Sequence, residues 1–208
     1  MTISIINYGC GNIGSVINML KHIGVATEVI TESKQVKKSE KIILPGVGKW
    51  DSGVKSLRDS GILSSLQERV LNDKVPVLGI CLGMQLLLDA SEEGTLPGLG
   101  WISGTVRPFD FSSLEIGGKR LAVPHMGWNA VTATQDSPLT ESIDENSKFY
   151  FVHSFFASVE NNENVLLQSE YGHSFTSGIR KENIYGLQFH PEKSHRHGMD
   201  IMKSFASI

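Results

Sequence analysis

A short apolar run that leads into Gly79-Ile80-Cys81-Leu82-Gly83 constrains the fold more than any other feature of the chain. Residues 75–80 are predicted to form a buried strand and residues 82–90 a helix. A cysteine between two glycines at such a strand-to-helix turn has the pattern of a nucleophile elbow, with cysteine in place of serine. The start of a helix favours the thiolate, and the N–H of Leu82 can point toward an oxyanion. The alternative is a structural cysteine buried in a strand.

Short apolar runs alternate with amphipathic stretches through the first half of the chain. Strands are predicted at 3–7, 26–30, 41–44 and 75–80, and helices at 13–23, at 54–71 with a break near Gly61, and at 82–90. The second half predicts strands at 105–109, 120–123, 130–134, 148–153, 165–170, 175–180 and 185–190, and a last helix at 198–205. The pattern predicts an α/β fold. It has three α/β/α layers, a central, mostly parallel sheet, and additional antiparallel strands in the second half.

Composition narrows the class of protein further. The chain has 208 residues, 40% hydrophobic and 20% charged, which excludes a disordered chain and a coiled coil. A formal net charge of -3 gives no general attraction for nucleic acid. Two cysteines, Cys10 and Cys81, exclude a disulfide scaffold and a four-cysteine zinc site. We expect one domain over residues 1–208, in the cytoplasm, without a signal peptide or a membrane span.

A cysteine nucleophile needs a base, and His190 is the best candidate among seven histidines. His190 ends a predicted strand and is followed by Pro191 and Glu192. In an extended backbone, positions two apart project to the same side, so Glu192 is expected beside the imidazole as its orienting carboxylate. Because parallel strands end at the same edge of a sheet, Cys81 and His190 should meet there. Alone, the pattern is more typical of a strand-end histidine beside a solvated carboxylate, and only its combination with Cys81 favours the catalytic interpretation.

Other strand ends carry weaker signals. Residues 44–48, Leu-Pro-Gly-Val-Gly, allow close backbone approach to a ligand and are candidates for oxyanion N–H donors, or an ordinary glycine turn. Residues 9–14, Gly-Cys-Gly-Asn-Ile-Gly, match the G-x-G-x-x-G pattern of dinucleotide-binding oxidoreductases, but the acidic residue that pattern requires is matched only partly. We favour a tight turn there, with Cys10 as a packing residue. Residues 195–197, His-Arg-His, are interpreted as a solvated basic turn and not as a metal site.

Three segments together resemble the class I glutamine amidotransferases: Pro45-Gly46-Val47-Gly48, Gly79-Ile80-Cys81-Leu82-Gly83-Met84-Gln85 and Gln188-Phe189-His190-Pro191-Glu192-Lys193-Ser194. Three more are similar to glutaminase subunits of this class that supply a cyclase in histidine biosynthesis: residues 7–12, 124–129 and 149–155. The resemblance extends over essentially the whole chain, although Asn7 stands where such subunits usually have Asp. It implies a flavodoxin-like fold.

The resemblance also implies a mechanism without a cofactor or a metal. The Cys81 thiolate attacks the side-chain amide carbon of glutamine and forms a thioester that water hydrolyses, while His190, oriented by Glu192, transfers the protons. The implied oxyanion donors are backbone groups at Val47, Gly48 and Leu82. The implied substrate-binding residues are Gly46, Gln85, His153 and Ser154.

The resemblance implies a partner as well. Such subunits form a heterodimer with a HisF-type cyclase, a (β/α)8 barrel that receives ammonia through a channel and makes imidazole glycerol phosphate and an aminoimidazole carboxamide ribotide. Asn12, Trp128 and Lys193 resemble residues at or near that contact, although a tryptophan such as Trp128 is equally typical of a buried core. A second possibility is a paralogue that supplies ammonia for modification of a surface sugar. A third is a catalytically silent regulatory subunit, against which the complete set of Cys81, His190 and Glu192 argues.

Overall fold

The computed structural model describes residues 2–112, 115–116 and 119–208 of the chain. Its helices are α1 (Ile13–His22), α2 (Ser33–Val36), α3 (Trp50–Asp59), α4 (Leu63–Gln67), the π-helical turn η1 (Glu68–Asn72), α5 (Leu82–Gln85), the 3-10 turns η2 (Asn162–Asn164) and η3 (Pro191–Lys193), and α6 (His195–Ser207). Its strands are β1 (Thr2–Ile6), β2 (Ala26–Ile30), β3 (Ile42–Gly46), β4 (Val77–Cys81), β5 (Ala90–Ser91), β6 (Gly104–Pro108), β7 (Glu115–Ile116), β8 (Lys119–Arg120), β9 (His125–Ala130), β10 (Thr132–Ala133), β11 (Lys148–His153), β12 (Phe155–Val159), β13 (Val165–Tyr171), β14 (His173–Lys181) and β15 (Ile184–Leu187).

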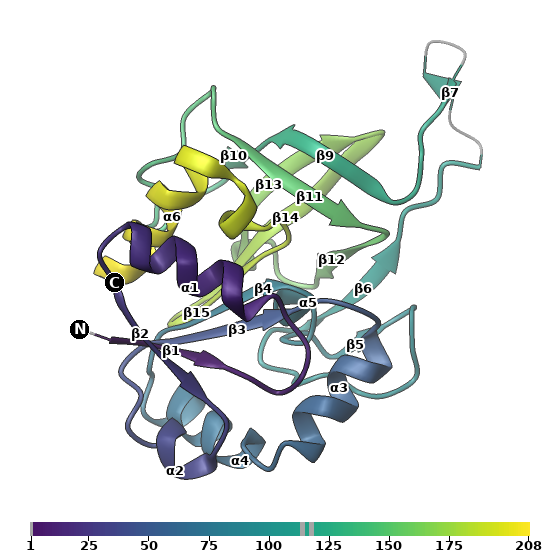
Figure 1. Cartoon of the computed structure of the whole chain (residues 1–208). Coiled ribbons are helices and arrows are strands. Elements are labelled where there is room, and N and C mark those ends of the chain that lie inside the picture. Colours follow the sequence, from purple (N-terminus) through teal and green to yellow (C-terminus); the bar gives the residue numbers. More distant parts are fainter. Residues whose placement is uncertain (1, 113–114, 117–118) are drawn as a thin grey trace.

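The main sheet is parallel in its first half and mostly antiparallel in its second. Its strand order is β2-β1-β3-β4-β15-β14-β12-β6-β5, with β13 pairing β14 and β10 pairing β13 (Figure 1). The five strands from β2 to β15 are parallel and follow the flavodoxin-like order 2-1-3-4-5. A separate antiparallel ribbon pairs β9 with β11. The predicted α/β fold is therefore confirmed.

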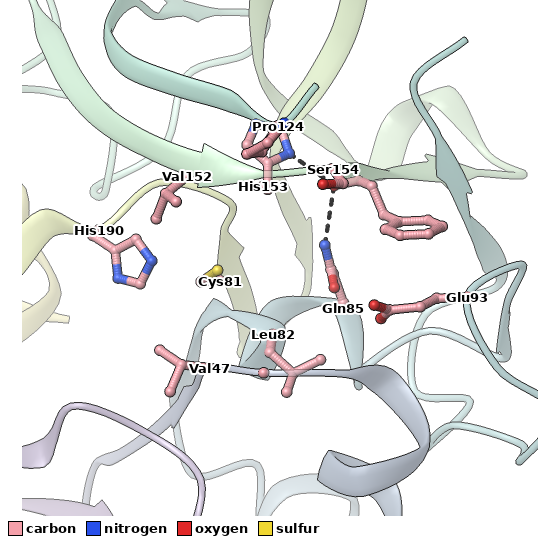
Figure 2. Close-up of a pocket in the computed structure, with 12 residues that line it drawn as sticks. Val47, Cys81, Leu82, Gln85, Glu93, Pro124, Val152, His153, Ser154 and His190 are labelled. Carbon is pink, nitrogen blue, oxygen red and sulfur yellow. Dashed lines mark hydrogen bonds between the residues drawn. The ribbon is translucent and has the colours of Figure 1, made fainter. Parts of the chain in front are cut away.

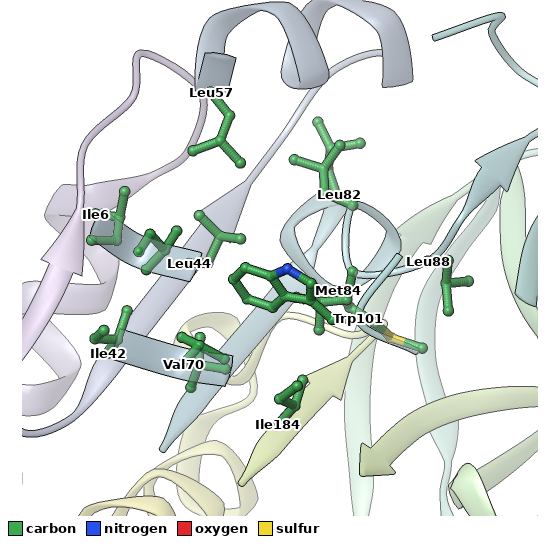
Figure 3. Packing of buried hydrophobic residues seen from close by; sticks show 14 of the residues in the cluster. Ile6, Ile42, Leu44, Leu57, Val70, Leu82, Met84, Leu88, Trp101 and Ile184 are labelled. Carbon is green, nitrogen blue, oxygen red and sulfur yellow. The ribbon is translucent and has the colours of Figure 1, made fainter. Parts of the chain in front are cut away.

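Helices cover both faces of the parallel strands (Figure 1). Successive strand residues point to opposite faces, so Ile5 packs in the cluster under α1 and α6, and Ile6 packs in the cluster under α3 and α4. Figure 3 shows part of the second cluster, to which Leu44, Leu57 and Trp101 belong. Within the described residues, no helix combines the length and the apolar character needed to span a bilayer.

Two predictions in the first half are corrected by the structure. The helix predicted at 82–90 ends at Gln85, because the carbonyls of Leu86, Leu87 and Leu88 accept hydrogen bonds from the backbone of the 99–102 loop instead of continuing the helix. The third strand does not stop before Pro45 but continues through Gly46 beside β4. Proline is tolerated there because β1 pairs with β3 only at residues 42 and 43. At position 45 there is no β1 residue opposite, so β1 loses no hydrogen bond to the missing proline N–H.

The second half contains more errors. Residues 121–123 are not a strand, the strand predicted at 130–134 is divided between β9 and β10, and β12 was not predicted. The strand predicted at 185–190 ends at Leu187, and α6 begins at His195 instead of residue 198. These strands are antiparallel and short, and β9 contains a glycine and an asparagine, so the alternation of buried and exposed residues is difficult to recognise from the sequence.

The glycine-rich turn after β1 packs tightly against β3. A Cβ on Gly11 would lie 3.2 Å from the ring of Pro45, whereas one on Gly14 would meet no atom within 4 Å. The dinucleotide pattern uses its third glycine for close helix–strand packing, which Gly14 does not provide. Asn12 caps α1 by accepting from Ser15 N (3.4 Å). Cys10 packs against the core, as predicted.

Candidate active site

Cys81 is the last residue of β4 and directly precedes α5. Its backbone has φ 54° and ψ -112°, a conformation that costs a non-glycine residue about 1–3 kcal/mol. Strand, sharp turn and helix thus follow one another as the sequence predicts. Because Leu82 is the first helical residue, its N–H has no intrahelical acceptor and can donate a hydrogen bond to a ligand.

Three glycines make this turn possible. A Cβ on Gly83 would collide with the carbonyl oxygen of Leu44, and one on Gly79 would lie 2.7 Å from the carbonyl oxygen of Gly83. Gly46 is paired with Cys81 in the ladder, and a Cβ on Gly46 would lie 2.9 Å from the backbone of Leu82. The backbones of β3, β4 and α5 are therefore in direct contact, and the position of Cys81 is fixed by main-chain packing.

His190 and Glu192 form a buried pair. His190 Nδ1 lies 2.7 Å from Glu192 Oε1, and both side chains are 2% exposed. The extended backbone predicted for this segment is wrong, because residues 191–193 form the 3-10 turn η3, yet the two side chains do lie side by side. The backbone N–H of His190 donates to the carbonyl of Tyr150 (2.9 Å), which joins the pair to β11.

The charge state of His190 depends on its neighbours. Burial lowers the pKa of this imidazole, but hydrogen bonding to Cys81 and to Glu192, together with their negative charges, outweighs burial and raises the pKa to about 10. At neutral pH this imidazole is therefore protonated, and it lies beside the Cys81 sulfur and the Glu192 carboxyl group. A protonated imidazole next to a cysteine can supply a proton to a leaving group.

A cavity of about 350 Å³ opens beside the cysteine (Figure 2). Eight of the predicted site residues line this cavity: Val47, Gly48, Cys81, Leu82, Gln85, His153, Ser154 and His190. Gly46 lies beneath it in contact with Leu82, and Glu192 lies behind His190. The structure thus brings residues from four separate segments around one space of a size suited to a small molecule.

Two polar residues at the cavity were missed. Glu93 lines it, and its Oε2 accepts a hydrogen bond from Trp50 N (2.8 Å). Gln188 is fully buried and donates through Nε2 to Cys81 Sγ (3.8 Å). The only sequence signal for Glu93 is that it lies in the polar segment 91–94 after the elbow helix. Gln188 lies two residues before His190, within a segment already singled out.

The three predicted contact residues are exposed on the surface. Trp128 is 47% exposed and stacks on the ring of His195 (5.3 Å between centroids), and Lys193 Nζ lies 5.8 Å from the centroid of Tyr150. Asn12 is exposed at the start of α1. Residues 195–197 form the first turn of α6 and not an irregular turn, but His195 and Arg196 are exposed to solvent as predicted, with the His195 ring stacked on Trp128.

Comparison with known families agrees with this geometry. Residues 4–207 match the sequence model of the family "Glutamine amidotransferase class-I". The chain belongs to the class I glutamine amidotransferases. As a member of this class it is a glutamine-hydrolysing enzyme, and the predicted resemblance is confirmed.

Curated relatives of this amidotransferase cover its full length. It is 45% identical over 203 residues to the imidazole glycerol phosphate synthase subunit HisH 2 of Methanococcus maripaludis, covering 98% of both chains. It is 44% identical to the HisH 2 subunit of Pseudomonas aeruginosa, covering 99% of both. It is 41% identical to the HisH subunit of Leptospira borgpetersenii, covering 99% of this chain and 100% of the other.

Solved structures share its fold at much lower identity. The structure of PurLQS from Thermotoga maritima matches with a TM-score of 0.73 and 18% identity, covering 99% of this chain and 97% of the other. A glutamine amidotransferase of the same organism matches with a TM-score of 0.61 and 16% identity, covering 100% of this chain and 83% of the other.

Proposed function

We propose that this enzyme hydrolyses L-glutamine at Cys81 and passes the ammonia to a HisF-type cyclase subunit for histidine biosynthesis. The observation that carries the proposal is the cavity lined by a strained, buried cysteine and by His190, whose Nδ1 is held by Glu192 behind it. Full-length similarity to HisH subunits supports the pathway.

In this mechanism the Cys81 thiolate attacks the amide carbon, and the carbonyl electrons move to oxygen. Backbone N–H groups of Leu82 and of the Val47–Gly48 turn stabilise the oxyanion. When the tetrahedral intermediate collapses, the C–N bond breaks and the His190 imidazolium gives its proton to the leaving ammonia. His190 then takes a proton from water, which attacks the thioester, releases glutamate and restores the thiolate. Glu192 stabilises the imidazolium throughout.

The cavity also offers groups for the two ends of the substrate. Glutamine carries an α-ammonium group, and Glu93 is the carboxylate that lines the cavity, so we assign it to that group. Gln85 and residues 153–154 also line the cavity and supply polar groups for the remaining atoms. Gly46 acts indirectly, by allowing Leu82 to approach β3.

A partner is required to use the product. Free ammonia is largely protonated in water near neutral pH and is then not a nucleophile. Around the cavity the surface is apolar: four of the five exposed large hydrophobic residues among those described are Val47, Val123, Met126 and Trp128. Val47 lines the cavity, Val123 precedes the lining residue Pro124, and the other two lie on β9. This surface, with Lys193 and Asn12 nearby, is where we place the barrel of the partner.

The first experiment tests the nucleophile. Cys81→Ala should abolish glutamate release from glutamine, because no other group in the cavity can form the thioester, while binding of the cyclase subunit is retained. Cys10→Ala is the matched control and should keep glutamate release near the parent rate. Glutamate release that survives in Cys81→Ala would show that the nucleophile is wrongly assigned.

The second experiment tests the partner. Adding a HisF-type cyclase and its nucleotide substrate should increase glutaminase turnover. Equal turnover with and without them contradicts the histidine-pathway assignment. Mass spectrometry of proteins that co-purify with the chain then distinguishes a histidine-pathway cyclase from a homologue that modifies a surface sugar.

A further inference from the structure

A line of hydrogen bonds runs from β9 into the wall of the cavity. Asn129 Nδ2 lies 3.3 Å from His125 Nε2, His125 Nδ1 lies 2.9 Å from His153 Nε2, and His153 Nδ1 lies 2.7 Å from the carbonyl oxygen of Phe155. His125 and His153 are buried, at 3% and 6% exposure. The His125 ring is also held between two aromatic rings, those of Tyr171 and Phe151, at 4.0 and 4.8 Å.

This line allows one arrangement of protons. A carbonyl only accepts, so His153 Nδ1 carries a hydrogen and its Nε2 is an acceptor. His125 Nδ1 must then be the donor, and its Nε2 accepts from Asn129, whose amide is oriented by donation to the carbonyl of Glu170 (2.8 Å). Burial lowers the pKa of His125 to about 4 and that of His153 to about 3, so both rings are neutral at neutral pH.

The line continues to the nucleophile. The carbonyl of Phe155 also accepts from Gln85 Nε2 (3.1 Å), and the same Nε2 donates to Gln188 Oε1 (3.0 Å). With both amide hydrogens used, the atom that Gln85 offers to a ligand is its Oε1 oxygen. Gln188, whose oxygen is occupied, turns its Nε2 toward Cys81 Sγ (3.8 Å). Figure 2 shows the bonds of His153 and Gln85 beside the cysteine.

We propose that His125 is a positioning residue: its Nδ1–H orders His153 and the Phe155 carbonyl, and thereby fixes which atoms Gln85 and Gln188 present to glutamine and to Cys81. This role rests on the proposed glutaminase function. Without the donor, His153 can turn or exchange its protonated nitrogen, and the carbonyl loses one of the two groups that hold it. The amide of Gln85 is then free to present either end.

Two substitutions test separately the contribution of the His125 N–H donor and that of its aromatic ring. His125→Phe keeps an aromatic ring between Tyr171 and Phe151 but has no N–H, whereas His125→Asn loses the ring but keeps an N–H near the position of Nδ1. We expect His125→Phe to lower kcat/KM for glutamine about five- to tenfold, mainly through KM, since one neutral hydrogen bond is worth about 1 kcal/mol. His125→Asn should remain within about twofold of the parent. If His125→Asn is the more impaired, or both are equally impaired, the role is packing and the proposal fails.

Two controls complete the design. His173→Phe makes the same substitution in the same aromatic cluster and should behave as the parent. The His173 ring lies at a tilt beside Phe109 (5.6 Å between centroids), and its Nδ1 lies 2.9 Å from the carbonyl oxygen of the neighbouring Ser174. Alkylation of Cys81 by iodoacetamide, measured in a Cys10→Ala background, needs no substrate. It should slow several-fold in His125→Phe and not in His125→Asn, because the Gln188 donor is released. If neither the parent enzyme nor any variant releases glutamate, the proposed function fails. The role of His125 is then tested by alkylation alone, and equal alkylation rates in His125→Phe and His125→Asn would overturn it.

Discussion

The two walls of the cavity are built in different ways. The wall formed by β3, β4 and α5 is packed backbone against backbone, with glycines where the chains touch. The wall formed by β9 and β11 is an antiparallel ribbon whose inner side chains are joined by hydrogen bonds between neutral rings and amides. The first wall leaves no space for an added carbon atom, and the second leaves no position for an added proton. Backbone packing therefore fixes the position of the nucleophile. The donor and acceptor assignment of the hydrogen bonds fixes the orientation of the side chains around it.

The largest effect is expected where both walls meet, at the triad. Glu192→Gln keeps the shape of the side chain but removes the charge and places an amide beside His190 Nδ1, so the pKa of His190 should fall. By analogy with carboxylate-to-amide changes in catalytic triads, kcat should drop on the order of 10⁴-fold. Steady-state glutamate release measures this. A loss below tenfold would mean that the carboxylate is not the orienting group.

The backbone wall is tested by Gly83→Ala. The new methyl group would overlap the carbonyl oxygen of Leu44, so β3 and α5 must separate, and the free energy of unfolding should fall by about 3 kcal/mol. Urea denaturation measures the change. Gly14→Ala is the control, since its methyl group would point into open space within α1 and should stabilise the helix by up to about 1 kcal/mol. Equal stability of the two variants would show that the wall can adapt.

The hydrogen-bonded wall is tested by pH. The folded-state pKa values of His125 and His153, about 4 and about 3, lie below the unfolded value of 6.5, so the unfolded state binds more protons as the pH falls. Their contribution to stability is complete above pH 6.5 and is lost progressively below it, by about 2 kcal/mol for the two rings together between pH 6.5 and 5.5. Urea denaturation at each pH should show this loss, and about half of it should disappear in His125→Phe. An unchanged slope would indicate that these rings are not held neutral.

The smallest effect is expected at the outer end of the ribbon. Asn129→Ala removes the donor to His125 Nε2 and the hydrogen bond to Glu170, and should cost about 1 kcal/mol of stability and a few-fold in KM. Thermal unfolding and glutamine titration measure both. The exposed Asn162→Ala serves as the reference. If Asn129→Ala raises KM more than His125→Phe does, then Asn129 does not act through His125, and the proposed sequence of hydrogen bonds from Asn129 through His125 to His153 is wrong.

The same contrast explains what could be predicted from the sequence. The parallel strands, the elbow and the His190–Glu192 contact depend on local patterns, namely continuous apolar runs, glycines around Cys81 and a separation of two residues. The ribbon depends on pairing between distant segments: His125 meets His153 only because β9 and β11 align in register. Nothing near His125 in the sequence indicates this partner. The early end of the elbow helix was missed for a similar reason, since loop 99–102 takes up its carbonyls.

Along β9, inward and outward residues alternate. His125 and Asn129 point into the hydrogen-bonded wall, while Met126 and Trp128 between them are exposed. Because neighbours on a strand face opposite ways, the outer positions can change over evolutionary time without altering the inner ones. If the exposed side of β9 binds the proposed partner, a gene duplicate of this enzyme can acquire a different acceptor subunit through a few surface substitutions and keep its chemistry.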